Sequence, residues 1–211
     1  MNTHQPEPAE PETKITKPEP GLRRDLLEGI FSWLILPITI VAVVNFFVIQ
    51  TFHVVGGSMV PTLQNSDYLI INKLGPTKAM AAGVVSQNKT AYTPKRNEII
   101  VFKYPKDPNL VYVKRVIGLP GDRIVIKDGQ VSIYNSSQPE GFDPNTGYLP
   151  SGNFTYNDTD MVIPQGTVYV IGDNRSPGGS SDSRDWGVLP VENIIGDVVL
   201  RLIPLNGIRS F

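Results

Sequence analysis

The feature that most constrains this chain of 211 residues is a run of 38 consecutive positions, 29–66, without Asp, Glu, Lys or Arg. Within that run, residues 30–51 are mostly apolar. A helix of this length would be about 33 Å long, at about 1.5 Å per residue, which matches the hydrocarbon core of a bilayer. Pro37 would break a helix in a soluble domain but is tolerated in a membrane span. We therefore expect one N-terminal transmembrane helix at residues 30–51.

Two other interpretations of the apolar run fit the sequence less well. Helices buried in soluble domains are rarely this long without a single charge. A cleaved signal peptide has a shorter apolar region that lies closer to the start of a chain, whereas this run begins at residue 29. A permanent anchor is the favoured interpretation.

The residues on either side of the expected span predict its orientation. Residues 1–20 hold five Pro and four Glu and have few apolar side chains, so we expect 1–29 to be a disordered tail. Arg23 and Arg24 precede the span, whereas the first basic residue after it is Lys73. Because basic residues favour the cytoplasmic side, the tail should be cytoplasmic and residues 52–211 exported.

The exported residues 52–211 have the pattern of a mostly β domain. Short runs of Val, Ile, Tyr and Phe are separated by turn-forming residues. Asp128-Gly129, between two such runs, is a hairpin signal. Residues 135–160 are rich in Asn, Ser, Gly, Asp and Pro, so about 128–165 should form a surface excursion or a small subdomain. Strands are expected at 67–73, 97–104, 110–117, 122–127, 130–134, 166–171 and 194–203.

The composition excludes several kinds of chemistry. The absence of Cys rules out disulfides, thiolate metal sites and cysteine nucleophiles, and two His argue against a multi-histidine metal centre. The net charge of −1 offers no broad cationic face to nucleic acid. His53 is near Ser58 in the sequence, but the spacing favours an interfacial His over a catalytic base. We expect no cofactor, no metal and no nucleic acid partner.

Two motifs carry candidates for nucleophilic chemistry. Residues 56–63, GGSMVPTL, follow the apolar run, and a tight turn there would present the hydroxyl of Ser58. The same pattern also fits a plain turn. In residues 112–122, YVKRVIGLPGD, strand alternation places Tyr112, Lys114 and Val116 on one face. Burial among apolar neighbours would lower the pKa of Lys114, and a fall from about 10.4 to about 8 would cost about 3 kcal/mol, which a folded domain can sustain. A neutral amine can take a proton from a Ser hydroxyl. The alternative is a solvated Lys at a sheet edge.

A third motif follows an apolar strand near the C-terminus. GDNR at residues 172–175 is followed by SSDSRDWG at residues 180–187. This segment mixes small hydroxyls, carboxylates and guanidinium groups. By itself it is also compatible with an Asp–Arg clamp that holds a loop.

In this order, behind an apolar anchor, the three motifs resemble the type I signal peptidase (leader peptidase) family over about residues 30–205. The resemblance implies a signal-peptidase-type catalytic domain of antiparallel sheets. It also implies a membrane-bound Ser-Lys endopeptidase that cleaves signal peptides from exported preproteins after small residues, at Ala-x-Ala type sites. Its partners would be those signal peptides and a lipid bilayer: a bacterial plasma membrane, with a thylakoid membrane as the alternative.

The resemblance assigns roles to individual residues. Ser58 would be the nucleophile and Lys114 the general base. Ser180 would hydrogen-bond and orient the Lys, while Asp182 and Arg184 would brace the loop. Asp173 and Asn174 match positions that are structural rather than catalytic.

Two departures from the family pattern affect these roles. The segment 176–181 is two residues longer than expected, so Ser181 and Ser176 remain alternatives to Ser180. Gly56 stands where some members have a Ser that helps to hold the oxyanion. The oxyanion would then depend mainly on backbone N–H groups, that of Ser58 included.

The same resemblance suggests how a substrate would bind. An extended peptide along segments 52–57 and 110–114 would alternate its side chains into shallow apolar pockets. Steric clash in such pockets rejects large residues. The side chains expected to line them are Phe52, Val54, Met59, Leu63, Tyr112 and Val113.

Other functions remain as alternatives. A repressor-type Ser-Lys autoprotease would carry a DNA-binding head in place of the acidic, Pro-rich tail. A membrane-anchored binding or adhesion module would leave the order of the three motifs as a coincidence. Ala79-Met80-Ala81 resembles a cleavage site, but without an apolar segment directly before it a plain loop is favoured over self-cleavage.

Overall fold

The computed structural model describes residues 21, 27–78, 92–145, 147–150 and 153–211. The chain divides into two compact units, 1–42 and 43–211. Of the expected disordered tail, residue 21 and residues 27–29 are described, and these are helical. The rest of the tail and Ala79-Met80-Ala81 lie outside the described residues.

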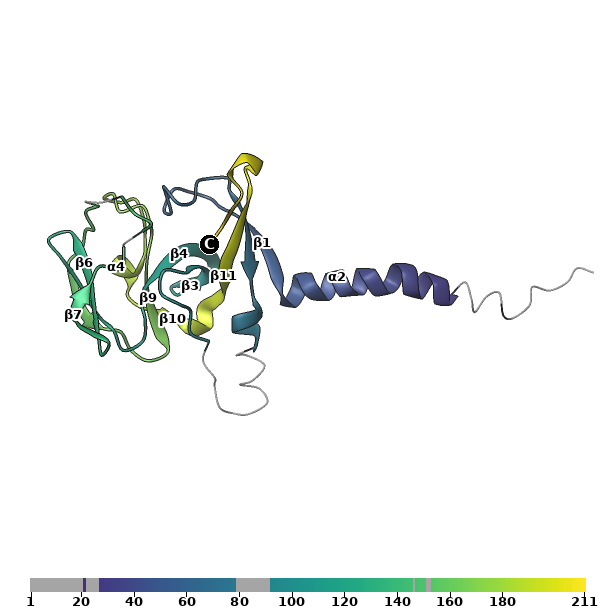
Figure 1. Ribbon diagram of the computed structural model, residues 1–211, viewed down its shortest axis with the longest axis horizontal. Coiled ribbons are helices and arrows are strands. Elements are labelled where there is room, and N and C mark those ends of the chain that lie inside the picture. The colour runs from purple at the N-terminus through teal and green to yellow at the C-terminus, as the bar shows by residue number, and fades with distance from the viewer. Residues whose placement is uncertain (1–20, 22–26, 79–91, 146, 151–152) are drawn as a thin grey trace, which may run out of the picture. The chain divides into compact units, whose positions relative to one another are not determined.

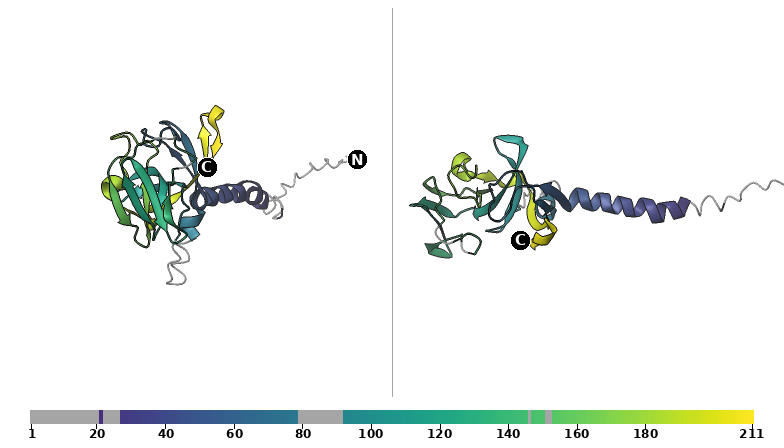
Figure 2. Two further views of the ribbon diagram at one scale, coloured as in Figure 1. Left: turned by 60° about the vertical axis from the view of Figure 1, so that its left-hand side comes forward. Right: turned by 90° about the horizontal axis from the view of Figure 1, so that it is seen from above.

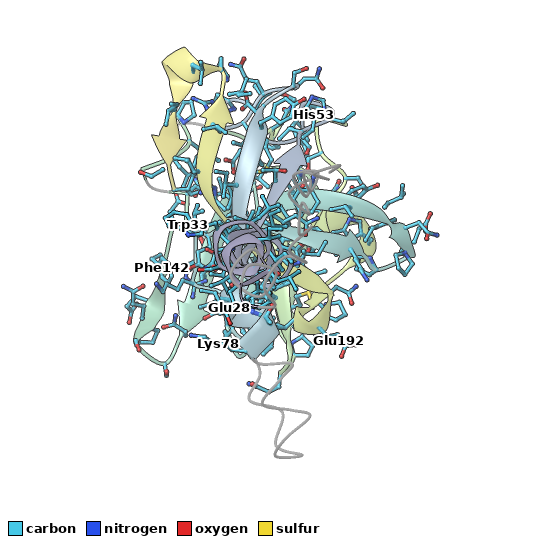
Figure 3. All side chains as sticks on the ribbon, turned by 90° about the vertical axis from the view of Figure 1, so that its right-hand side faces the viewer. Glu28, Trp33, His53, Lys78, Phe142 and Glu192 are labelled. Atoms are coloured by element: carbon cyan, nitrogen blue, oxygen red, sulfur yellow. The ribbon has the colours of Figure 1, made fainter. Side chains whose placement is uncertain are left out.

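Helical backbone accounts for most of the apolar run. Residues 27–30 are helical, and the π-helix η1 (Phe31–Ile35) and then α2 (Leu36–Phe47) follow without a break. Between residues 27 and 43 most large apolar side chains are exposed, and Trp33 is the most exposed of them at 85% (Figure 3). Within the described residues, none of the helices is both long enough and apolar enough to cross a bilayer.

The expected helix at residues 30–51 ends too late. Helical backbone stops at Phe47, and Ile49–His53 form strand β1. This strand pairs antiparallel with β2 (Tyr68–Asn72), with Ile49 opposite Asn72. The β-branched and aromatic residues of β1 suit a strand, and hydropathy alone does not distinguish an apolar strand from the end of an apolar helix.

The second unit consists of two antiparallel sheets, as the sequence predicted (Figure 1). The larger sheet has the order β1-β2-β11-β3-β4-β9-β10, and β12 pairs with β11. Its further strands are β3 (Ile99–Tyr104), β4 (Asp107–Gly118), β9 (Thr167–Ile171), β10 (Leu189–Pro190), β11 (Ile194–Ile203) and β12 (Arg209–Ser210). The smaller sheet has the order β7-β6-β5-β8, formed by β5 (Arg123–Lys127), β6 (Gln130–Asn135), β7 (Gln138–Phe142) and β8 (Thr159–Val162).

All seven predicted strands are present, with boundaries within three residues of those expected. The hairpin at Asp128-Gly129 is also confirmed, since both residues have positive φ, 52° and 80°, between β5 and β6. The strands that the sequence did not indicate are β1, β7, β8, β10 and β12. β10 and β12 have two residues each, too few for an alternation, and β7 contains Pro139 and Gly141, which are rare in strands.

Short helical elements connect the last strands. These are α4 (Ser183–Trp186), η2 (Val191–Asn193) and η3 (Leu205–Gly207). The hairpin that contains η3 projects beyond its neighbours in the sheet (Figures 1 and 2). The strand that positions the site is β4, whose second half is buried and which pairs with β3 on one side and β9 on the other.

Candidate active site

Ser58 lies in a tight turn, residues 56–63, between β1 and β2. Met59 and Leu63 point into the core and are buried, and the Leu63 N–H donates to the Met59 carbonyl at 2.9 Å. Gly56 has φ of 95°, a region that glycine adopts without strain, and its N–H donates to Asn65 Oδ1 at 2.9 Å. The turn is therefore anchored by its apolar residues, and Ser58 stays partly exposed.

The side chain of Lys114, from the buried half of β4, reaches this turn. Its Nζ donates to Ser58 Oγ at 2.7 Å and to the Val113 carbonyl at 2.9 Å. It also lies 5.2 Å from the centre of the Tyr112 ring, as expected for two residues on one face of a strand. The two candidate residues are thus within hydrogen-bond distance although 56 positions separate them in the sequence.

Burial governs the protonation of this amine. Lys114 is 4% exposed, and burial lowers its pKa to about 8, against the opposing effect of the carboxylates of Asp182 and Asp173. An amine with such a pKa is partly neutral near physiological pH and can accept a proton from a neighbouring hydroxyl. The contact therefore has the geometry and the electrostatics of a nucleophile and its general base.

His53 does not occupy the position of a base. It lies on β1 with an exposed side chain whose ring packs 4.9 Å from that of Tyr68 (Figure 3). In the part of the chain that the structure describes, the hydrogen-bond partner of Ser58 Oγ is Lys114. The Ser-His alternative is therefore not supported by the geometry.

Gly172 and Asn174 contact the turn of residues 56–63, called the nucleophile turn below after its candidate residue Ser58. A side chain at Gly172 would overlap the carbonyl oxygen of Ser58 and the hydroxyl of Ser180, so only glycine fits there. The Asn174 N–H donates to the Ser58 carbonyl and its Nδ2 to the Gly57 carbonyl, both at 3.0 Å. The Ser58 N–H, in contrast to the carbonyl, has no hydrogen-bond partner among the described residues. Sequence reasoning placed Asn174 among structural residues but did not reveal its contact with the turn.

The expected hydrogen bond between Ser180 and Lys114 is not made. Ser180 Oγ is buried against Gly172 and has no hydrogen-bond partner within the described residues. The two further candidates lie elsewhere: Ser181 lines the cavity in front of the dyad, and Ser176 lines a second cavity. The longer 176–181 segment left this choice open, because counting along a loop does not predict where its side chains point.

Asp182 is a fully buried carboxylate that joins three parts of the last motif. It accepts two hydrogen bonds of 2.7 Å from Nε and Nη2 of Arg184 and one of 2.9 Å from the Gly172 N–H. It also caps the N-terminus of α4. Burial alone would raise the pKa of Asp182, but the hydrogen bonds from Arg184 and Gly172 hold it below its usual value. Asp182 and Arg184 thus fix the loop next to Gly172.

A second buried ion pair lies next to Lys114 on the other face of β4. Arg115 donates to both carboxylate oxygens of Asp173, at 2.9 and 2.6 Å, and to Thr62 Oγ1 at 3.4 Å. It therefore ties β4 to the 172–175 segment and to the nucleophile turn. Sequence reasoning missed this pair; the signal was an Arg beside the candidate Lys and an Asp in GDNR.

A cavity of about 320 Å³ opens beside Ser58 and Lys114. Four of the six residues expected to contact substrate line it: Phe52, Val54, Tyr112 and Val113. The other two, Met59 and Leu63, do not, because they are the core residues that anchor the turn. The lining that sequence reasoning missed comprises His53, Val55, Leu69, Val101, Val111 and Ser181.

Comparison with known proteins agrees with this geometry. The family model described as "Signal peptidase, peptidase S26" matches residues 27–203, which include all three motifs. The chain belongs to this family. The family expected from the motifs is therefore confirmed, and with it the assignment to a class of peptidases.

Relatives of the chain carry the same family's names. "Signal peptidase I" of Pseudomonas fluorescens is 32% identical over 192 residues, which cover 74% of this chain and 66% of that protein. "Signal peptidase I" of Bacillus caldolyticus is 34% identical over 180 residues, 80% of this chain and 87% of the relative. "Probable signal peptidase I-1" of Synechocystis sp. is 32% identical over 187 residues, 81% and 82% of the two chains.

Proposed function

We propose that this chain is a membrane-bound serine endopeptidase that removes signal peptides from exported preproteins, with Ser58 as nucleophile and Lys114 as general base. The observation that carries the proposal is the 2.7 Å contact between Lys114 Nζ and Ser58 Oγ in a buried setting. Membership of the signal peptidase family supports the class of substrate.

The proposed mechanism uses the amine twice. Neutral Lys114 takes the proton of Ser58 Oγ as the oxygen attacks the scissile carbonyl, and the free Ser58 N–H donates to the oxyanion that forms. The ammonium then protonates the leaving amine. Lys114 next deprotonates the water molecule that attacks the acyl-enzyme, and it returns that proton to Ser58 Oγ as the acid product leaves. Asp182 and Asp173 favour the ammonium state through their charge.

The shape of the cavity beside the dyad supports selection of small residues. Its walls come from β1 and β4, so an extended peptide between them would place alternate side chains against Phe52, Val54, Tyr112 and Val113. Small residues such as Ala fit into a cavity of about 320 Å³ that several substrate side chains share, and steric clash with its lining would act against large ones. We therefore propose Ala-x-Ala type sites.

A membrane anchor is part of the same proposal. It rests on the mostly apolar and helical residues 30–47 and on the large exposed apolar side chains of η1 and α2. Soluble proteins rarely leave so much contiguous apolar surface uncovered. Arg23 and Arg24 before the apolar run orient the tail to the cytoplasm and residues 52–211 to the exported side of a bacterial plasma or thylakoid membrane.

Cleavage of a preprotein tests the function directly. The full-length chain, recovered from the membrane fraction in detergent, should cut a preprotein with an Ala-x-Ala site once, after the second Ala. N-terminal sequencing of the product identifies the site. A matched preprotein with Phe in place of the second Ala should stay intact. Failure to cut the first substrate, or equal cutting of both, would contradict the proposal.

The pKa of Lys114 predicts the dependence of activity on pH. Because the base must be neutral and burial lowers its pKa to about 8, kcat/KM should rise with pH and level off above about 8. Below that value each pH unit should reduce the neutral fraction, and with it kcat/KM, about tenfold. Initial rates on a fluorogenic peptide from pH 6 to 10 measure the profile. A profile that is flat, or that levels off below pH 7, would exclude Lys114 as the base.

A further inference from the structure

A second cavity, of about 380 Å³, adjoins the nucleophile turn and shares no lining residue with the cavity beside the dyad. The residues that matter here are Val60, Pro61, Phe154, Tyr156, Asn174 and Ser176. Its volume lies within the range of ligand-binding pockets. The proposed mechanism so far assigns it no role.

This cavity begins two residues from the nucleophile. Val60 and Pro61 continue the turn that presents Ser58. Asn174, which also lines the cavity, holds the Gly57 and Ser58 carbonyls. The cavity and the reacting hydroxyl are therefore joined by a short and well-anchored piece of backbone.

The irregular segment before β8 supplies the aromatic wall of the cavity. The Phe154 ring packs against Gly129 at the tip of the β5–β6 hairpin, and the Thr155 N–H donates to the Gly129 carbonyl at 2.8 Å. Thr155 Oγ1 accepts from the buried Arg175 at 2.8 Å. Hydrogen bonds to Gly129 and from Arg175 thus fix this segment. The ring centroids of Phe154 and Tyr156 are 4.7 Å apart, and both side chains remain about half exposed.

Both charged residues in the lining of this cavity have their polar groups hydrogen-bonded to described residues, although Arg175 has no carboxylate partner among them. Asp173 is paired with Arg115. Arg175 donates to four neutral acceptors: the Gly172 carbonyl, Thr155 Oγ1, Asn145 Oδ1 and the Tyr148 hydroxyl. Asn174 and Ser176 add uncharged polar groups. Such a lining suits an uncharged peptide backbone with apolar side chains rather than an ionic ligand.

We propose that this cavity binds the part of the substrate that follows the scissile bond, the first residues of the mature protein. The inference rests on the proposed peptidase function. A polypeptide cut in its interior extends on both sides of the nucleophile, and the cavity between β1 and β4 accounts for one side only. The turn residues Val60 and Pro61 lead from Ser58 into the second cavity, which takes the other side. Aromatic rings on a fixed backbone, such as Phe154 and Tyr156, are effective contacts for a peptide.

Two substrates that share the residues before the scissile bond distinguish the contribution of the second cavity from that of the cavity beside Ser58 and Lys114. One continues for several residues after an Ala-x-Ala site, and the other ends there in a coumarin amide. The full-length enzyme should show about tenfold higher kcat/KM on the longer substrate, because binding energy away from the reacting bond assists catalysis. Tyr156→Ala should lose most of that gain and act on the short substrate within about twofold of the unsubstituted enzyme.

Val162→Ala is the matched control. Val162 is an apolar residue of the smaller sheet, 61% exposed and absent from the cavity lining. It should leave both activities unchanged. Equal kcat/KM on the two substrates, an equal loss on both in Tyr156→Ala, or a loss confined to the short substrate would each overturn the inference while leaving the peptidase function intact. No cleavage of either substrate by the unsubstituted enzyme would instead overturn the proposed function.

Discussion

Replacing Lys114 by Met should abolish preprotein cleavage, with kcat lower by about a thousandfold or more. Met has a similar length and suits a buried site but cannot accept the proton of Ser58 Oγ, to which the Lys114 amine is hydrogen-bonded at 2.7 Å. Ser58→Ala should have the same effect, because it removes the nucleophile. Single-turnover assays of preprotein cleavage at pH 9 measure the loss.

A matched control separates the base from the mere loss of a positive charge. Lys127 on β5 is exposed, and Lys127→Met should cleave at the normal rate. Since burial disfavours the charged form of Lys114, its replacement should not destabilise the fold at pH 7, and thermal unfolding checks this. Cleavage by Lys114→Met or Ser58→Ala within about tenfold of the unsubstituted rate would show that the dyad is not the catalytic pair.

Replacing Asp182 by Ala should lower the free energy of unfolding by about 3–5 kcal/mol. The change leaves the buried guanidinium of Arg184 without its carboxylate, and it removes the acceptor of the Gly172 N–H and the N-cap of α4. Because Gly172 underlies the nucleophile turn, activity should fall as well. Urea unfolding followed by tryptophan fluorescence measures the stability.

The smaller sheet provides a control with the same geometry in a different environment. Arg123 and Asp160 form a bidentate salt bridge, in which Nε and Nη2 of the Arg donate to the two carboxylate oxygens at 2.7 and 2.6 Å. Both side chains are about half exposed. Water screens such a pair, so Asp160→Ala should leave the urea midpoint unchanged. If the Asp182 and Asp160 variants unfold at the same urea concentration, the buried pair is not what stabilises the loop.

Local patterns in the sequence predicted much of the sheet. Runs such as residues 99–104 and 123–127 are rich in β-branched residues, and turn formers separate them, so their strands follow from local preference. β1 was missed because its apolar residues continue an apolar helix, and the strand exists through its pairing with β2. β7 likewise depends on its partner β6 and not on its own residues, which include Pro139 and Gly141.

The candidate site likewise combines features that local sequence predicts with features that depend on tertiary packing. Ser58 and Lys114 were identified from motifs, because a hydroxyl in a Gly-rich turn and a Lys between apolar residues are local features. The packing of Met59 and Leu63 in the core, and the absence of a hydrogen bond from Ser180 Oγ to Lys114, depend on how the turn and the loop pack, which motif counting does not show. The contacts of Asn174 with the nucleophile turn join residues more than a hundred positions apart.

The sequence by itself determined which chemistry was available: a chain without Cys and with two His leaves few candidates for the base of a Ser nucleophile, and the motif around Lys114 offers one. Only the tertiary structure decided that this amine is buried and lies within hydrogen-bond distance of Ser58 Oγ. Lys114 of β4 and the Ser58 turn meet across 56 positions of sequence, although three strands separate β4 from β1 in the larger sheet, and the surrounding core removes water from the amine. A lowered pKa of Lys114 is a consequence of that desolvation, which arises only when distant segments pack.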